Sequence, residues 1–240
     1  MPHRTQLIKP GLLGAFSLAL AVFAASATAT DAGRDAPVIT AATVVPVRTL
    51  APALAVGDVV FIRVGARPFR EVAAATGSWT NHVGVVVSTD GNEPLIAESA
   101  FPLSRTTRLS RFVARSEGGR VAVRRLATPL TAEQKFDIAA AAQKRLGVFY
   151  DTGFDLHSRR QFCSRFVREV LSEATGVAVG EAETFGTLLA RQPGAKLGFW
   201  RVWYLGHIPW QRETVTPASL LRSPALTPVF DGIALPDPAA

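Results

Sequence analysis

Cys163 is the only cysteine among the 240 residues, and its position in the sequence suits a reactive thiol. It stands near the start of the segment 162–175, where apolar residues recur at helical spacing, so we expect the thiol in the first turn of a helix. The helix dipole and the free N–H groups of a first turn favour a thiolate and can hold an oxyanion. The alternative is an inert cysteine buried in the core. A lone cysteine excludes an internal disulfide and a zinc cage of several thiols.

His82 and Glu98 are the residues that we expect to assist this thiol. His82 opens the β-branched run HVGVVVST, and Glu98 lies in LIAES beyond a turn at residues 90–92. A hairpin turning there places the two strands side by side, so Glu98 could orient the His82 ring as a base for Cys163. The alternatives are a satisfied histidine at a strand end and a solvated glutamate. His157, which precedes the cysteine segment, could lie at the site entrance.

The elements that must position these residues follow from periodicity and turn signals. We expect strands at 58–64, from His82 onward, at 95–98 and at 120–126, and helices at 68–75, 131–146, 162–175 and 217–221. Residues 131–134 form a capping-box sequence. The Trp-rich run 199–210 is expected to return to the sheet. Strands mixed with helices, without regular βαβ alternation, predict an α+β fold around an antiparallel sheet.

The N-terminal segment 1–29 has the pattern of a cleaved export signal, with a basic start, an apolar stretch and small residues before the predicted cleavage site. Residues 30–52 read as an extended arm or linker, and 209–240 as a Pro-rich segment that packs on or trails the domain. The hydrophobic class makes up 48% and charged residues 19%, which excludes a disordered chain. The net charge is +7, and Arg4 and Lys9 of the leader contribute two of these charges. The remaining excess does not by itself indicate nucleic-acid binding.

A cluster of arginines follows the predicted hairpin. If its segment is helical, Arg105, Arg108, Arg111 and Arg115 line one face, because they are spaced by three or four residues. Such a face could attract carboxylate-rich cell-wall peptides or anionic lipid headgroups. The alternative is an ordinary solvated surface.

Five segments in order resemble a known family. The segments GDVVF, WTNHVGVVV, LIAES, GVFYDTGFD and FCSRFV are similar to the permuted papain-like amidases, the YiiX-like cysteine hydrolases of the NlpC-type clan. The resemblance covers residues 54–176 and returns at VTPASLLRSPALTPVF. It implies a circularly permuted papain-like fold over 53–208, in which an antiparallel sheet or small barrel packs on a helix that starts with the catalytic cysteine.

The resemblance also implies roles for individual residues. Cys163 matches the nucleophile, His82 the general base and Glu98 the residue that orients it. Tyr150 matches a tyrosine at the wall of the site, and Ser164 is expected to help bind substrate or the oxyanion. The chain departs from the family at Asn81, where serine is usual, and at residues 165–166, where Arg-Phe replaces the common Glu-Leu. The second departure puts substrate choice in doubt.

Together these residues predict an exported cysteine hydrolase, periplasmic or secreted, that cleaves amide bonds in cell-envelope substrates without a cofactor or metal. A lipid-directed acyl hydrolase or acyltransferase is the alternative among enzymes, because the same circular order occurs in acyl-transferring relatives. The aromatic run 199–210 would suit an acyl chain, although core packing also explains it. A non-catalytic envelope-binding module that uses the arginine face is the alternative outside the enzymes.

Overall fold

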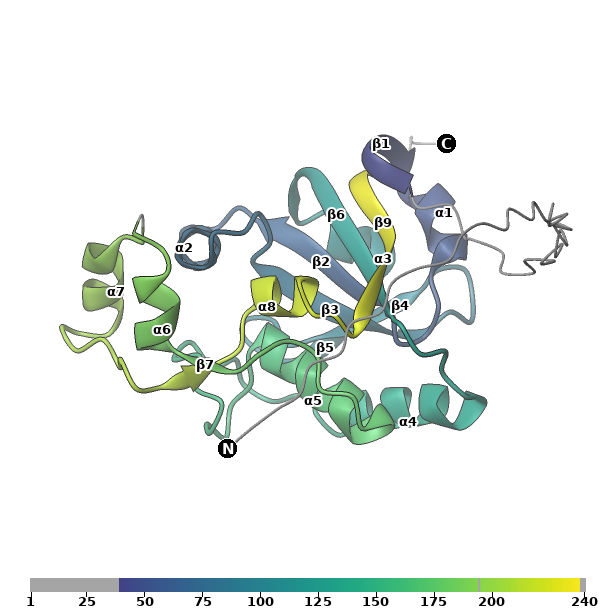
Figure 1. Cartoon of the computed structure of the whole chain (residues 1–240). Coiled ribbons are helices and arrows are strands. Elements are labelled where there is room, and N and C mark those ends of the chain that lie inside the picture. Colours follow the sequence, from purple (N-terminus) through teal and green to yellow (C-terminus); the bar gives the residue numbers. More distant parts are fainter. Residues whose placement is uncertain (1–38, 194, 238–240) are drawn as a thin grey trace, which may run out of the picture. The chain divides into compact units, whose positions relative to one another are not determined.

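The computed structural model describes residues 39–193 and 195–237, in which a seven-stranded sheet carries helices on both faces (Figure 1). The strand order is β1-β9-β6-β2-β3-β4-β5. Strands β1 and β9 pair in parallel, and every other neighbouring pair is antiparallel. The bounds of these strands are β1 Ile39–Pro46, β2 Val59–Val64, β3 His82–Ser88, β4 Leu95–Glu98, β5 Arg105–Arg108, β6 Ser116–Leu126 and β9 Leu226–Leu235. This mixed sheet and its helices confirm the predicted α+β class.

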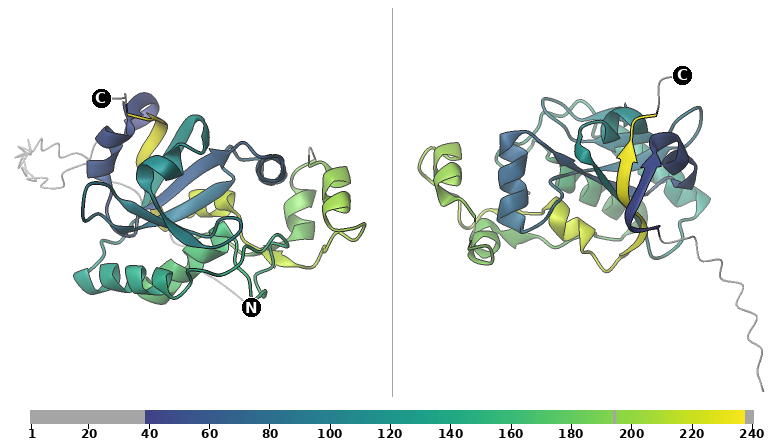
Figure 2. Two further views of the ribbon diagram at one scale, coloured as in Figure 1. Left: turned by 180° about the vertical axis from the view of Figure 1, so that it is seen from behind. Right: turned by 90° about the horizontal axis from the view of Figure 1, so that it is seen from above.

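The helices fall into three groups around the sheet. Helices α4 (Ala132–Gln143) and α5 (Cys163–Thr175) pack on one face. Helix α1 (Val47–Leu50), the 3₁₀ turn η1 (Ala51–Ala53) and helix α3 (Leu109–Val113) cover the other. The remaining elements are α2 (Arg67–Thr76), α6 (Phe185–Ala190), α7 (Leu197–Trp203), α8 (Pro217–Leu221) and the short pair β7 (Glu183–Thr184) and β8 (Glu213–Thr214). Helices α6 and α7 lie at the opposite end of the molecule from α1 (Figures 1 and 2).

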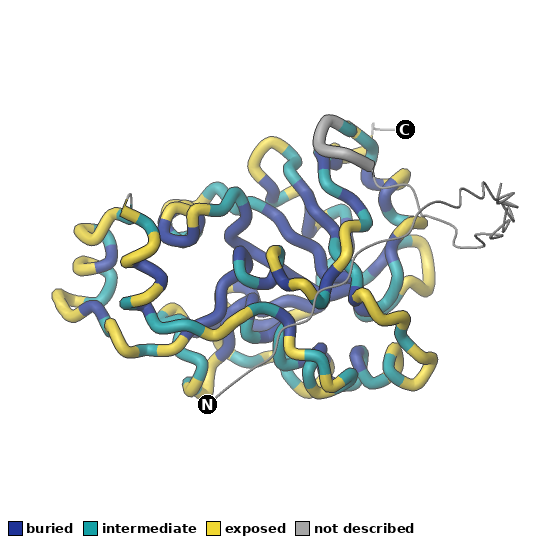
Figure 3. The backbone as a smooth tube through the Cα atoms, in the orientation of Figure 1, coloured by how far each residue is buried: buried dark blue, intermediate teal, exposed yellow. Residues whose placement is uncertain are grey.

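Two apolar cores follow from the alternation of side chains along the strands. Val59 and Phe61 of β2 face α4 and α5, whereas Val60 and Ile62 face α1 and α3. All four are fully buried, and most of β2 and β3 is dark blue in Figure 3. Because both faces are covered, the ends of the strands form the accessible margin at which a site can be built.

Local signals explain where the main helices begin and end. Thr131 and Gln134 form the predicted capping box at the start of α4, with reciprocal hydrogen bonds of 3.1 and 3.0 Å. Gly176 ends α5 in the left-handed conformation, at φ 74°. Gly84 in β3 has a different role, because a Cβ there would stand 2.5 Å from Ile96 Cγ2 and 3.0 Å from the Phe112 ring. Glycine therefore lets α3 approach β3 two residues from His82.

The structure corrects the expectation for the N-terminal arm and decides between the two alternatives for the C-terminal segment. Within the expected arm 30–52, residues 39–46 form β1, which pairs with β9, and residues 47–53 form α1 and η1. The segment 209–240 packs on the domain, since residues 226–235 form β9 between β1 and β6. Both outcomes have one cause, a pairing between distant segments that local patterns do not report. The predicted export signal at 1–29 lies outside the described residues.

Two internal expectations were also wrong. Residues 199–210 do not return to the sheet, because 197–203 form α7, where the Phe199 and Trp203 rings stack 5.6 Å apart at helical spacing. The arginine segment is not a single helix, because residues 105–108 form edge strand β5 and only 109–113 are helical. Within the described residues, no helix is both long and apolar enough to cross a membrane.

Candidate active site

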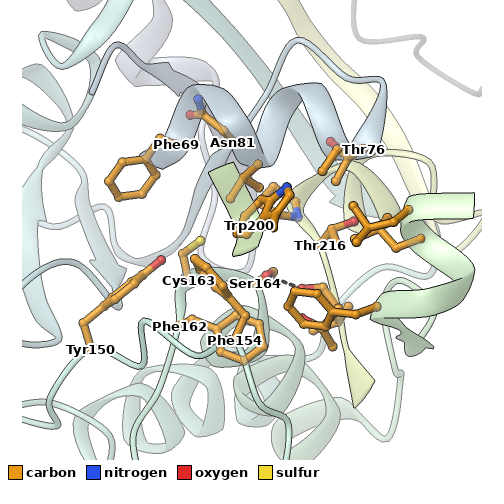
Figure 4. Close-up of a pocket in the computed structure, with 18 residues that line it drawn as sticks. Phe69, Thr76, Asn81, Tyr150, Phe154, Phe162, Cys163, Ser164, Trp200 and Thr216 are labelled. Atoms are coloured by element: carbon orange, nitrogen blue, oxygen red, sulfur yellow. Dashed lines mark hydrogen bonds between the residues drawn. The ribbon is translucent and has the colours of Figure 1, made fainter. Parts of the chain in front are cut away.

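Cys163 is the first residue of α5, as its position in the sequence predicts. The thiol is buried, with 3% of the residue exposed. Phe162, the residue before it, is extended and caps no backbone N–H with its side chain, so the N–H groups of the first turn remain available. The sulfur borders a pocket, and Figure 4 shows the Tyr150 hydroxyl pointing toward it.

His82 and Glu98 form a buried pair beside this thiol. Strand β3 begins at His82 and the antiparallel β4 ends at Glu98, so both residues lie at the same end of the strand pair. His82 Nε2 lies 2.6 Å from Glu98 Oε2, and both side chains are almost completely buried. The other ring nitrogen, Nδ1, is buried and makes no hydrogen bond of ordinary geometry within the described residues. It is the nitrogen left to serve Cys163.

The electrostatics of the pair favour a charged imidazole. Burial lowers the pKa of His82, but hydrogen bonding and charge interactions with Cys163 and then Glu98 outweigh burial and raise it to about 9. Burial raises the pKa of Glu98, but His82 and then Arg115 outweigh it and lower the pKa to about 2. At neutral pH the site therefore holds a carboxylate against an imidazolium.

Arg115 and Thr107 hold Glu98 from the side away from His82. One guanidinium nitrogen of Arg115 lies 2.8 Å from each carboxylate oxygen of Glu98, and the Thr107 hydroxyl donates to Oε1 at 2.7 Å. The Arg115 guanidinium also lies over the Phe112 ring, 5.0 Å from its centroid, and that ring packs against His82. Three donor groups thus make four contacts with the carboxylate and fix its position.

The predicted arginine face is divided by these contacts. Arg105 and Arg115 approach Glu98, whereas Arg108 and Arg111 line the same surface groove without ion pairs in the described part of the chain. Sequence reasoning found all four residues but missed the role of Arg115 and Thr107. No local sequence signal indicates this role, because the contacts with Glu98 depend on the pairing of β5 with β4 at the sheet edge.

Tyr150 and Ser164 both lie at the pocket. Burial raises the pKa of Tyr150 well above its usual value, and neighbouring Cys163 and Asp151 add to this, so the hydroxyl keeps its proton. The Cys163 backbone N–H points to the same hydroxyl oxygen. Ser164 donates its hydroxyl to the Val215 carbonyl at 2.7 Å, so this side chain is occupied in tying α5 to the segment before α8.

The other histidines of the described chain stand apart from this pair. His157 is exposed, and its Nε2 lies 2.9 Å from Glu213 on the surface. His207 is also exposed and contacts only the Leu205 carbonyl through Nδ1. Neither contacts Cys163, so His82 is the base that the geometry offers.

The pocket beside the thiol encloses a cavity of about 30 Å³, and Figure 4 shows residues that line it. Its walls come from α2, from the loop before α5, from α6 and α7, and from the segment before α8. Its labelled residues in Figure 4 are Phe69, Thr76, Asn81, Tyr150, Phe154, Phe162, Cys163, Ser164, Trp200 and Thr216. Among these elements, sequence reasoning did not assign α6 to the site, whereas it considered the aromatic run 199–210, which overlaps α7, as a place for an acyl chain.

A helix that starts with a cysteine, packed on an antiparallel sheet that carries a histidine and its carboxylate partner, defines the papain-like class of fold. Here the histidine strand precedes the cysteine helix, which is the permuted order. The chain belongs to the family of permuted papain-like amidase enzymes YaeF/YiiX, family C92, whose match spans residues 53–230. The resemblance and the fold predicted from the five sequence segments are thereby confirmed.

Two relatives show the extent of the similarity. YiiX of Escherichia coli strain K12, itself described as uncharacterized, is 31% identical over 175 residues, which are 72% of this chain and 84% of YiiX. A crystal structure described as metalloprotein yiiX from Escherichia coli O157:H7 has a TM-score of 0.68 and 28% identity. It covers 73% of this chain and 96% of its own.

The description of that structure as a metalloprotein raises the question of a metal site here. Within 39–193 and 195–237, no group of three or more His, Cys, Asp or Glu residues is placed to hold a metal ion. Glu98 already faces Arg115 and His82, so its oxygens are occupied. These residues do not fit a metal centre, and we derive no step through one.

Proposed function

We propose that this protein is a cysteine hydrolase that cleaves an amide bond through Cys163, His82 and Glu98. The observation that carries the proposal is the buried His82–Glu98 pair, with its free Nδ1, beside a thiol at the start of α5. Membership in a family of amidases supports the reaction class. A module that only binds its ligand has no need of a buried ion pair directed at a thiol.

In the proposed reaction the Cys163 thiolate attacks the carbonyl carbon of the amide, so that an S–C bond forms. The tetrahedral intermediate collapses, the C–N bond breaks, and His82 gives its proton to the leaving amine. Water then attacks the thioester while His82 accepts a proton from it, and the acid leaves as the S–C bond breaks. Glu98 holds the imidazole ring in position throughout.

The oxyanion of this intermediate would be held by two donors beside the sulfur, one at the start of α5 and one in the segment before it. In the structure the Cys163 backbone N–H points to the oxygen of the protonated Tyr150 hydroxyl, beside the sulfur, and a substrate oxygen would replace this contact. Preorganised donors of this kind typically contribute about 10²–10³-fold to the rate. Ser164 would act through its backbone in the first turn, since its hydroxyl is bound to Val215.

Modification of Cys163 tests the proposal directly, because the chain has no other thiol. Purified protein treated with iodoacetamide should gain one adduct, and amide substrates should be turned over in parallel assays. Cys163→Ala should abolish turnover while circular dichroism shows an unchanged fold. If Cys163→Ala keeps more than a few per cent of the activity, the thiol mechanism is wrong.

We further propose that the protein acts outside the cytoplasm on cell-envelope substrates, after removal of residues 1–29. The support is the leader-like sequence alone. The N-terminal sequence of protein from a periplasmic or culture fraction would decide this, and an intact Met1 on membrane-bound protein would contradict it.

Arg108 and Arg111 support a further proposal, contact with an anionic lipid surface at the edge strand β5. Both lie in the groove beside β5 without an acidic partner in the described part of the chain. Co-sedimentation with anionic vesicles should decline when both are changed to Glu. Equal binding to neutral vesicles would contradict an electrostatic contact.

A further inference from the structure

A groove with a volume of about 680 Å³ lies beside β5, the strand at one edge of the seven-stranded sheet. It shares no lining residue with the pocket at the thiol. Four arginines line the groove, and no acidic side chain is among its lining residues; they are Arg105 and Arg108 of β5, Arg111 of α3, and Arg115 of the turn after α3. Like charges around one hollow repel one another, and a bound anion would remove that repulsion.

Arg108 and Arg111 are the free cations of this groove. Both residues are exposed, and neither side chain makes an ion pair or a hydrogen bond within the described part of the chain. Glu93, which precedes β4, accepts from the Ser110 backbone N–H instead. Thr106 is also exposed and lines the groove with a hydroxyl that has no partner among the described residues. Two guanidinium groups and one hydroxyl are therefore available to a ligand.

Arg105 and Arg115 connect the groove to the catalytic carboxylate. Arg115 donates to both oxygens of Glu98 through Nη2, at 2.8 Å each. Arg105 Nε lies 3.8 Å from the same carboxylate, its side chain is 45% exposed, and its hydrogen bond to the Phe101 carbonyl is long at 3.5 Å. Arg105 can therefore turn toward an anion in the groove while Arg115 stays with Glu98. The charge that faces Glu98 then changes, and His82 is hydrogen-bonded to Glu98.

The charge and geometry of the groove suit a phosphate group better than a carboxylate. A planar guanidinium binds two oxygens of a phosphate at once, and a phosphate has further oxygens for a second guanidinium or a hydroxyl. A single carboxylate offers only two oxygens, for which Arg108 and Arg111 would compete. One carboxylate, that of Glu98, already occupies Arg115 behind the groove.

We propose that the groove beside β5 binds a phosphate group between Arg108 and Arg111, as a second site apart from the thiol. Arg105 and Glu98 transmit its occupancy to His82. The phosphate of a lipid headgroup and that of a soluble ester have the same chemistry. In its lipid form the inference rests on the contact proposed above, whereas the site itself does not depend on the hydrolase reaction. The alternative is that these charges only keep the edge strand from pairing with other chains.

Isothermal titration calorimetry with inorganic phosphate tests the site, with chloride used to hold the ionic strength constant. We expect one saturable site in the wild-type protein. Arg108→Ala/Arg111→Ala should raise its Kd at least about tenfold, because charge-assisted hydrogen bonds are lost. Arg159→Ala/Arg160→Ala is the matched control, since it removes two exposed arginines outside the groove and should leave Kd within about twofold.

Three results of the titration would overturn the site. The first is the absence of saturable binding in the wild-type protein, which is expected if the charges only protect the edge strand. The second is an equal rise of Kd in the two double variants. The third is binding of succinate, a dicarboxylate, as tight as that of phosphate, which would assign the groove to carboxylates.

The NMR signals of the His82 ring test the link to the catalytic pair. Phosphate should shift them with a midpoint equal to the calorimetric Kd, whereas the exposed His157 and His207 should not follow that curve. In Arg108→Ala/Arg111→Ala the same additions should leave His82 unchanged. An equal shift in that variant would indicate a general ionic effect, and binding without a shift of His82 would overturn the link.

Vesicles of phosphatidylglycerol and phosphatidylcholine separate the two sources of phosphate. If a headgroup occupies the groove, glycerol phosphate at constant ionic strength should release the protein from these vesicles. If phosphate binds but vesicles do not, the ligand is soluble, and the lipid contact fails while the site stands. If vesicles bind but no phosphate site is found, the groove proposal fails. Amide cleavage is assayed separately, so a failure of the hydrolase is seen on its own.

Discussion

The two sides of the Cys163 thiol use their polar groups in different ways. On the side of His82, one carboxylate is contacted by donors from β3, from β5 and from the residue before β6, and all of them are buried or half-buried. On the pocket side, polar side chains bond to nearby backbone and leave an apolar wall. The difference shows that charged groups hold the His82 ring in place, whereas the pocket side of the thiol is lined by apolar side chains and by polar groups that are bonded within the protein.

Removing the imidazole is the most severe test of the charged side. His82→Ala should lower kcat/KM by about 10²–10⁴-fold, because the leaving amine loses its proton donor. Glu98→Gln should lose less, since the ring remains and only its orientation and charge are weakened. Thermal unfolding of both variants serves as the control. A larger loss in Glu98→Gln than in His82→Ala would contradict these roles.

The pH dependence of kcat/KM is the next test of the charged side. Because the pKa of His82 is raised, the stability that its ion pair with Glu98 contributes is fully present below 6.5, the usual pKa of histidine. This contribution is lost as the pH rises through about 9. Because the pKa of Glu98 is lowered, the stability that its carboxylate contributes is fully present above 4.5, the usual pKa of glutamate. This contribution is lost as the pH falls through about 2.

We therefore expect kcat/KM to fall about tenfold per pH unit above roughly pH 9, where the imidazolium is lost. The chemical shifts of the His82 ring in an NMR titration would report the same transition. A decline centred near pH 6.5 instead would show that the ion pair does not shift His82.

Arg115 gives the smallest and most specific effect. Arg115→Met should lower kcat/KM by about tenfold and move its alkaline limb to lower pH, because Glu98 loses two hydrogen bonds that hold it ionised. Arg115→Lys should restore part of both. Arg48→Met, an exposed residue in α1, is the control and should change neither. A drop in rate without a shift of the pH limb would indicate a merely structural role.

Local signals predicted much of the fold and the central residues of the site. The capping box at Thr131, the strand that opens at His82 and the helix that starts at Cys163 all depend on neighbouring residues, so single-sequence reasoning reaches them. The hairpin turn likewise brought Glu98 beside His82. Each of these inferences needs only a few residues of context.

The rest depends on contacts between distant segments. Arg115 reaches Glu98 only because β5 pairs with β4, and the pocket walls form only where α6 and α7 meet α2. The parallel pairing of β1 with β9 has no signature in either segment. The aromatic residues at 199–204 are compatible with a strand or a helix. In the helix that forms there, α7, Trp200 packs against Ala75 and Leu189, which are distant in the sequence.

The position of β9 has a consequence for the synthesis of the chain. It lies between β1 and β6, so β1 has no neighbour in the sheet until β9, which follows the other six strands of the sheet in the sequence, has been made. Such non-local pairing delays folding. For a chain that leaves the cytoplasm as proposed, the delay keeps the sheet open during translation, and the strand that closes it crosses after the other six.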